Sequence, residues 1–185
     1  LNIMTSRGCP YDCVFCYKGT FGRKYRVRSV ENVVKEWEYL VKSLKVKEIG
    51  IQDDLFNFDL ERSEQICELI IEKNLQVPWS LPNGIRADNV TESLLKKMEK
   101  SGCYRLAFGV ESGEQKILDS IGKNLKIEEV EKAFSLVKKT KIKTIAFFVL
   151  GNPGEDETTM RKTIDFAIKL DPDYAQFTMA TPYPG

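Results

Sequence analysis

Three cysteines that lie within eight residues constrain this chain more than any other feature of its sequence. They are Cys9, Cys13 and Cys16, spaced C-x3-C-x2-C, and the chain has no histidine. The other two cysteines, Cys67 and Cys103, are far away along the sequence. Clustered thiolates are typical ligands of soft metals and of iron–sulfur clusters. Three thiolate ligands for a cluster that normally takes four predict one iron that is open to another ligand.

Composition limits the class of protein further. The chain has 185 residues, of which 42% are hydrophobic and 30% charged, so it is long enough for one domain with a substantial core. A net charge of +1 argues against a dedicated nucleic-acid module. No apolar run approaches the ~20 residues of a membrane span, and the start does not resemble a signal peptide. Five cysteines, three of them clustered, fit a reducing cytoplasm better than a disulfide framework.

Apolar segments alternate regularly with amphipathic ones. The predicted strands are residues 1–7, 48–52, 77–81, 104–110, 144–150 and 174–179, and helices are predicted between them. This alternation predicts an α/β fold with a parallel sheet that is covered by helices on its outer face. A complete eight-fold barrel takes about 250 residues, so six units predict a partial TIM barrel, (βα)6. A doubly wound open sheet is the alternative, although no G-x-G-x-x-G motif follows the first strand.

Both architectures place a functional site at the carboxyl ends of the strands. Polar and glycine residues do concentrate just after the predicted strands, at residues 9–16, 53–54, 83–86, 111–112, 151–155 and 180–183. Cys103 precedes its strand and therefore lies at the opposite end, which makes it a poor fourth ligand. Cys67 falls on the apolar face of a helix, where we expect it in the core.

The cysteine motif, with Phe15 just before its last cysteine, resembles the C-x3-C-x-(aromatic)-C loop of radical S-adenosylmethionine (SAM) enzymes. The resemblance covers essentially the whole chain, and it implies a radical SAM core domain over residues 1–185. We expect this domain to be excised from a longer protein, because the chain starts without methionine inside an apparent strand.

The resemblance also implies a chemistry. Three cysteines hold a 4Fe–4S cluster, and SAM chelates the open iron through its amino and carboxylate groups. One electron, from a donor such as flavodoxin or ferredoxin, cleaves SAM to a 5′-deoxyadenosyl radical, which abstracts hydrogen from a substrate that the sequence does not identify. The protein must orient SAM and exclude water, while the cofactors carry the difficult chemistry.

Further positions are implied by the resemblance alone. Gln52, Asp53 and Asp54 occupy the place of the family's Gly-Gly-Glu-Pro segment, which binds the SAM amino group, but they depart from that pattern. The resemblance assigns Glu111 to the ribose or the amino group and the segment that starts at Gly151 to the adenine. Arg86 is a candidate partner for the SAM carboxylate.

The sequence leaves several alternatives open. Residues 105–113 and the closing Pro-Tyr-Pro-Gly look like the cobalamin-associated and methylthiotransferase-like branches of the family, in which cobalamin would be bound by a domain outside this chain. An RNA-modifying methylthiotransferase is one alternative, and a non-catalytic iron–sulfur or zinc module is another. A closed zinc site needs four ligands, which this loop does not supply. The basic segment 18–28 is either a solvated loop or a counter-charge for the thiolates and for anionic partners.

Overall fold

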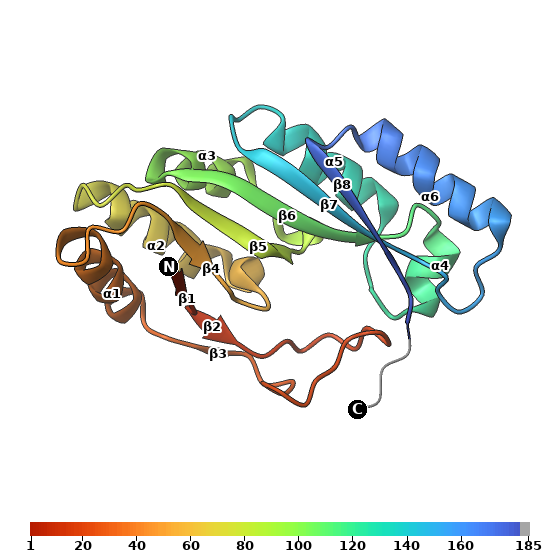
Figure 1. Ribbon diagram of the computed structural model, residues 1–185, viewed down its shortest axis with the longest axis horizontal. Helices are drawn as coiled ribbons and strands as arrows, with labels where there is room; N and C mark the ends of the chain where they lie inside the picture. Colours follow the sequence, from red (N-terminus) through yellow and green to blue (C-terminus); the bar gives the residue numbers. More distant parts are fainter. Residues whose placement is uncertain (182–185) are drawn as a thin grey trace.

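The computed structural model describes residues 1–181, so the closing Pro-Tyr-Pro-Gly lies outside the described residues. It contains a six-stranded parallel sheet (Figure 1). The strands of this sheet, in their order across it, are β1 (Asn2–Ile3), β4 (Ile49–Ile51), β5 (Trp79–Ile85), β6 (Cys103–Glu111), β7 (Lys143–Leu150) and β8 (Tyr174–Met179). Each strand therefore lies beside its neighbour in sequence. In a doubly wound sheet the order of the strands would reverse at one point in the sheet. The predicted partial barrel is therefore confirmed, and the alternative is wrong.

Helices cover one face of the sheet, as the sequence predicted (Figure 1). They are α1 (Val30–Lys42), α2 (Leu60–Glu72), α3 (Glu92–Ser101), α4 (Gln115–Ser120), α5 (Ile127–Val137) and α6 (Glu157–Leu170), with short 3-10 turns η1 (Phe56–Phe58) and η2 (Ala87–Asn89). Side chains cap two of these helices, because the Ser29 and Thr91 hydroxyls accept hydrogen bonds from the backbone N–H groups of Asn32 and Leu94. Within residues 1–181, no helix is long and apolar enough to cross a membrane.

The core lies between the sheet and these helices. Its largest side chains are Trp37 and Trp79, whose rings meet edge to face with their centroids 6.0 Å apart. Each indole N–H is satisfied, by the Leu75 carbonyl at 3.1 Å and by the Ser101 hydroxyl at 3.2 Å. A continuous apolar layer therefore supports the sheet from its outer face and leaves the carboxyl ends of the strands free to carry polar groups.

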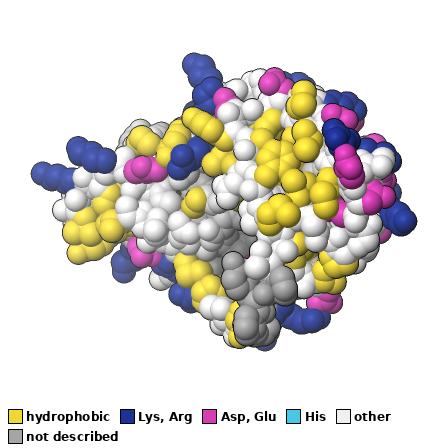
Figure 2. Space-filling model, turned by 45° about the vertical axis from the view of Figure 1, so that its right-hand side comes forward, with side chains coloured by type: hydrophobic (Ala, Val, Ile, Leu, Met, Phe, Trp, Pro, Cys, Tyr) yellow, Lys and Arg dark blue, Asp and Glu magenta, His cyan; other side chains and the backbone are white. Residues whose placement is uncertain are grey.

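The barrel is open, because β1 and β8 are edge strands that do not pair with each other among the described residues. All six residues of β8 are exposed. Apolar side chains gather on the side of the molecule that is turned forward in Figure 2. Exposed apolar residues of β8 and α6 are Ile164, Ile168, Tyr174, Phe177 and Met179.

Two predicted boundaries are wrong. The predicted strand 1–7 leaves the sheet after Ile3, and its end forms β2 (Ser6–Arg7), which pairs antiparallel with β3 (Arg26–Val27) inside the basic segment. The Thr5 N–H donates to a carboxylate rather than to a neighbouring strand, and the ladder ends there. Strand β5 also continues to Ile85, through a register shift that accommodates Pro82.

Candidate functional site

The cysteine loop, residues 8–17, follows β2 and passes below the carboxyl ends of the strands (Figure 1). Backbone hydrogen bonds hold it at both sides. The Cys9 N–H donates to the Gly22 carbonyl at 3.3 Å, and the Val14 N–H donates to the Ile121 carbonyl at 3.0 Å. The loop is thus tied both to the basic segment and to the turn that follows α4.

Gly8 begins the cysteine loop at a position that requires glycine. Its φ is +86°, and a Cβ atom there would lie 2.3 Å from the Lys24 carbonyl oxygen. The Gly8 N–H donates to the Asp54 carboxylate at 2.9 Å. The entry to the loop is therefore fixed by close backbone packing and by an acidic side chain from the end of β4.

The three thiols of the loop are free, with Cys9 and Cys13 half-buried and Cys16 exposed. Burial raises the pKa of the Cys13 thiol, and the positive charges of Lys123, Lys18 and Arg86 oppose this rise. The three cations therefore favour the anionic form of Cys13, which is the form that binds iron, although burial outweighs them. Within residues 1–181, no three ligating side chains are already drawn together around a metal position. Donor type and surrounding charge nevertheless fit a thiolate-bound cluster.

The other two cysteines lie where the sequence predicted. Cys67 is buried on α2, and burial raises its pKa to about 12, so its thiol stays protonated. Cys103 is the first residue of β6 and is also buried. Both belong to the core rather than to the site.

Asp53 is buried, and its carboxylate is occupied by the protein itself. It accepts the Thr5 N–H at 2.6 Å, the Thr5 hydroxyl at 2.5 Å and the Ser6 hydroxyl at 2.7 Å. These bonds join the end of β4 to the β1–β2 connection just before the cysteine loop. Gln52, next to it, is half-buried and donates its N–H to the Ile3 carbonyl at 2.9 Å.

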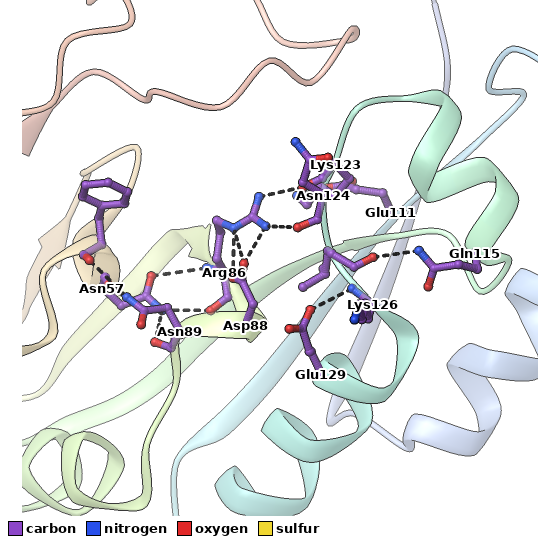
Figure 3. A network of polar contacts seen from close by, with 12 residues as sticks. Asn57, Arg86, Asp88, Asn89, Glu111, Gln115, Lys123, Asn124, Lys126 and Glu129 are labelled. Atoms are coloured by element: carbon purple, nitrogen blue, oxygen red, sulfur yellow. Dashed lines mark hydrogen bonds and ion pairs between the residues drawn. The ribbon is translucent and has the colours of Figure 1, made fainter.

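Arg86 is likewise occupied (Figure 3). Its guanidinium donates to the Asp88 carboxylate from Nε and Nη2, to the Lys123 carbonyl at 2.8 Å and to the Asn124 carbonyl at 2.7 Å. These contacts use four of its five N–H donors. Burial lowers the pKa of Arg86, but the Asp88 carboxylate outweighs that effect and the net shift is upward, so the group stays charged.

Glu111 and Lys123 form a buried ion pair at the end of β6 (Figure 3), with 2.6 Å between the Lys123 Nζ and the Glu111 Oε1. Glu111 has a φ of +68°, an uncommon conformation for a residue with a side chain, and it follows a register shift in β6. Gly109 leaves room for the pair, because a Cβ there would lie 2.7 Å from the Glu111 carboxylate and 2.8 Å from the Lys123 Nζ. Sequence reasoning missed Lys123, and no local pattern marks it.

Lys123 also faces the cysteine loop. Its Nζ lies 6.0 Å from the centroid of the Phe15 ring, which is 44% exposed. Among residues 1–181, the Lys123 ammonium donates a hydrogen bond only to Glu111. Two of the three N–H groups of this ammonium are therefore available to a ligand. The structure thus brings together the cysteine loop, Phe15, Glu111 and Lys123.

Gly151 lies on the far side of this arrangement, at the end of β7. Its φ is +84°, and its N–H donates to the Glu155 carboxylate at 2.6 Å. The loop that it begins touches the end of α4, where the Ser120 hydroxyl donates to the Pro153 carbonyl at 3.4 Å. Gly151 therefore belongs to the same edge of the sheet, next to β8 rather than beside the thiols.

Comparison with known proteins identifies the family. The sequence pattern of the radical SAM superfamily matches residues 3–167, and the chain therefore belongs to that superfamily. Its members use a 4Fe–4S cluster and SAM, as the resemblance of the cysteine loop implied.

Individual relatives agree with this assignment. The chain is 39% identical over 184 residues to an uncharacterized methyltransferase of Pyrococcus horikoshii, covering 99% of this chain and 40% of that protein. It is 33% identical to the anaerobic magnesium-protoporphyrin IX monomethyl ester cyclase of Rubrivivax gelatinosus, covering 97% and 32%. The fold matches the radical SAM methyltransferase TsrM from Kitasatospora setae with a TM-score of 0.87 at 21% identity, covering 96% and 36%. The chain therefore spans about a third to two fifths of the length of the proteins that it matches.

Proposed function

We propose that this chain is the catalytic core of a radical SAM enzyme, in which Cys9, Cys13 and Cys16 hold a 4Fe–4S cluster. The observation that supports this most directly is the free three-thiol loop, which is anchored below the carboxyl ends of the strands and has the positive charges of Lys123, Lys18 and Arg86 acting on Cys13. When bound, the cluster and SAM supply the one-electron cleavage that starts the reaction on the substrate. This chain's own residues hold the loop, provide charge for SAM and shield the site from water.

Lys123, rather than Arg86, is our candidate for the SAM carboxylate. Four of the five Arg86 donors are engaged within the protein, whereas two Lys123 donors are not. A buried ammonium with spare donors binds a carboxylate well, because the surrounding low dielectric strengthens charge-assisted hydrogen bonds. The Phe15 ring beside it offers an apolar surface for the rest of SAM.

The acidic positions divide into two groups. Glu111 stays our candidate for the SAM ribose or amino group, since its second carboxylate oxygen has no partner among the hydrogen bonds of residues 1–181. Asp53 and Asp54 act by holding the cysteine loop, and Gln52 contributes its backbone. Gly151 stays the candidate for the adenine, because it lies at the carboxyl end of β7, where a Cβ atom would already contact the Met179 side chain at 3.7 Å.

The proposal is tested by anaerobic reconstitution with iron and sulfide, followed by dithionite and SAM. We expect a 4Fe–4S electron paramagnetic resonance (EPR) signal that SAM perturbs, and 5′-deoxyadenosine as a product. Replacing Cys13 by alanine should abolish the cluster, while replacing the core residue Cys67 should leave it intact. A wild-type cluster that forms but is indifferent to SAM would contradict the proposal.

Methyl transfer assisted by cobalamin is the reaction class that the relatives favour. The Pyrococcus relative is described as a methyltransferase, and TsrM is a methyltransferase that binds cobalamin. Cobalamin would be bound by a domain outside this chain. The electron would come from a small donor protein such as flavodoxin or ferredoxin, and a reducing cytoplasm would keep the five thiols free. In a longer protein that includes the cobalamin-binding domain, formation of S-adenosylhomocysteine from SAM only when cobalamin is present would support this reaction class.

A further inference from the structure

The Arg86 side chain contacts two separate parts of the site at once. Its guanidinium carbon lies 3.7 Å from the centroid of the Tyr11 ring, and Tyr11 is part of the cysteine loop between Cys9 and Cys13. The same guanidinium donates to the carbonyls of Lys123 and Asn124, which form the turn that carries the Lys123 ammonium (Figure 3). One buried side chain therefore joins the thiol loop to the turn of the cation.

The guanidinium has little freedom to move. The Asp88 carboxylate holds it from one side through Nε and Nη2, at 2.9 and 2.7 Å. Asn57 holds the backbone of Arg86, since its amide donates to the Arg86 carbonyl at 2.8 Å and its oxygen accepts the Arg86 N–H at 3.3 Å. The side chain is 6% exposed. Its plane and position are thus set before any ligand arrives.

Tyr11 is confined on a second side as well. Its ring meets the Phe58 ring edge to face, with the centroids 6.2 Å apart and the planes at 85°. The ring therefore has Arg86 over its face and meets Phe58 of η1 at nearly a right angle. Because Tyr11 is two residues from each of two thiols, its position limits where Cys9 and Cys13 can lie.

We propose that Arg86 is a positioning residue, which fixes the cysteine loop and the Lys123 turn relative to each other through Tyr11 and the two carbonyls. This inference rests on the proposed function, because it concerns the distance between the thiol loop and the cation for SAM. A planar guanidinium is required, since a lysine ammonium is a point charge that cannot stack on a ring and bridge two carbonyls in one plane. Arg86 thus acts through its neighbours and does not itself bind SAM.

The first test measures the order of the loop by hydrogen exchange, before iron and sulfide are added. The variants are Arg86→Lys, Tyr11→Leu and Tyr11→Phe, with Arg161→Gln as the control on the exposed face of α6. We expect the amides of Cys9 and of residues 11–16 to exchange about tenfold faster in Arg86→Lys and in Tyr11→Leu. Tyr11→Phe keeps the ring face and should match wild type, as should Arg161→Gln. Equal exchange in all variants would overturn the positioning role, and Tyr11→Leu decides it where Arg86→Lys fails to fold.

The second test titrates SAM into the reconstituted protein and follows the EPR spectrum of the reduced cluster. We expect the dissociation constant of SAM to rise about tenfold in Arg86→Lys and in Tyr11→Leu, with unchanged iron content, and not in Tyr11→Phe. The double variant should bind SAM no more weakly than Arg86→Lys alone, because both substitutions break one contact. Additive losses would overturn the proposal. Failure of SAM to perturb the wild-type spectrum would instead contradict the proposed function, while hydrogen exchange would still decide the role of Arg86.

Discussion

The carboxyl ends of β4 and β5 differ from the carboxyl end of β6 in how their polar side chains are used. At β4 and β5, Asp53 and Arg86 direct nearly all of their hydrogen-bonding groups to the protein itself. At β6, Glu111 and Lys123 satisfy each other with a single ion pair and keep further acceptors and donors. Polar residues at the strand ends thus serve two purposes. Those at β4 and β5 hold the loop that carries the cysteines, and those at β6 keep groups that a ligand can use.

The two regions also differ in backbone geometry. Glu111 has a left-handed conformation after a register shift, and Gly109 makes room for its ion pair. Strained backbone of this kind costs roughly 1–3 kcal/mol and is concentrated at functional sites. Arg86 also follows a register shift, in β5, but neither Arg86 nor Asp53 has a positive φ. The strained backbone of Glu111 and the spare donors of Lys123 together support the β6 end as the place where the ligand binds.

The largest effect on stability that this comparison predicts is for Asp53→Ala. The substitution leaves the Thr5 N–H and two hydroxyls without their buried acceptor. We expect the free energy of unfolding to fall by about 4 kcal/mol, since hydrogen bonds to a buried charge contribute about 1.5–3 kcal/mol each and do not add fully. The melting temperature should fall by roughly 8–16 °C in a thermal denaturation experiment.

Asp165→Ala, at an exposed position of α6, is the matched control for this prediction and should melt within about 2 °C of wild type. SAM affinity per folded, cluster-loaded Asp53→Ala molecule should be retained within a few-fold. A variant that keeps its melting temperature but loses SAM would show that Asp53 binds the ligand, and the two regions would no longer differ.

The second prediction concerns the β6 end, where affinity rather than stability should respond. Replacing Lys123 alone would leave Glu111 buried without its partner, which destabilises the fold for an unrelated reason. The informative pair is therefore Glu111→Gln against the double variant Glu111→Gln with Lys123→Met. We expect the double variant to bind SAM about 30-fold more weakly than the single one, equivalent to about 2 kcal/mol for a charge-assisted bond. A titration of SAM followed by EPR measures the affinity of both variants. Equal affinities would show that Lys123 does not bind SAM.

The sequence does not predict which strand ends hold the cysteine loop and which keep free polar groups. The strand–helix alternation predicted the sheet and the location of Asp53, Arg86 and Glu111, because apolar periodicity is a local signal. The hydrogen-bonding partners of these residues come from other strands and loops. No pattern in the neighbouring sequence therefore shows which of their donors and acceptors are already used within the protein. Lys123 lies in a short turn after α4 and is buried only because Gly109 and Glu111 accommodate it.

The sequence does not predict the pairing of the two-residue strands β2 and β3, which lie far apart along the chain. Strands β2 and β3 are separated by the cysteine loop and most of the basic segment, and two residues carry no periodicity. The sequence predicts no strand in the basic segment, yet residues 26–27 pair with β2 next to the entry of the cysteine loop. Such short ladders depend on contacts like that of Thr5 with Asp53, which only the folded chain shows.

The smallest effect is predicted for Asp54, the exposed neighbour of Asp53. Its carboxylate accepts one bond, from the Gly8 N–H at 2.9 Å, in a partly solvated position. Asp54→Ala should cost about 1 kcal/mol of stability, or roughly 2–4 °C in melting temperature, because water replaces much of the lost bond. Asp54→Asn keeps an oxygen acceptor and should match wild type, and hydrogen exchange should show a faster Gly8 amide in the alanine variant alone. A cost as large as that of Asp53→Ala would mean that the entry to the cysteine loop, rather than the buried carboxylate, is the principal anchor of this side of the site.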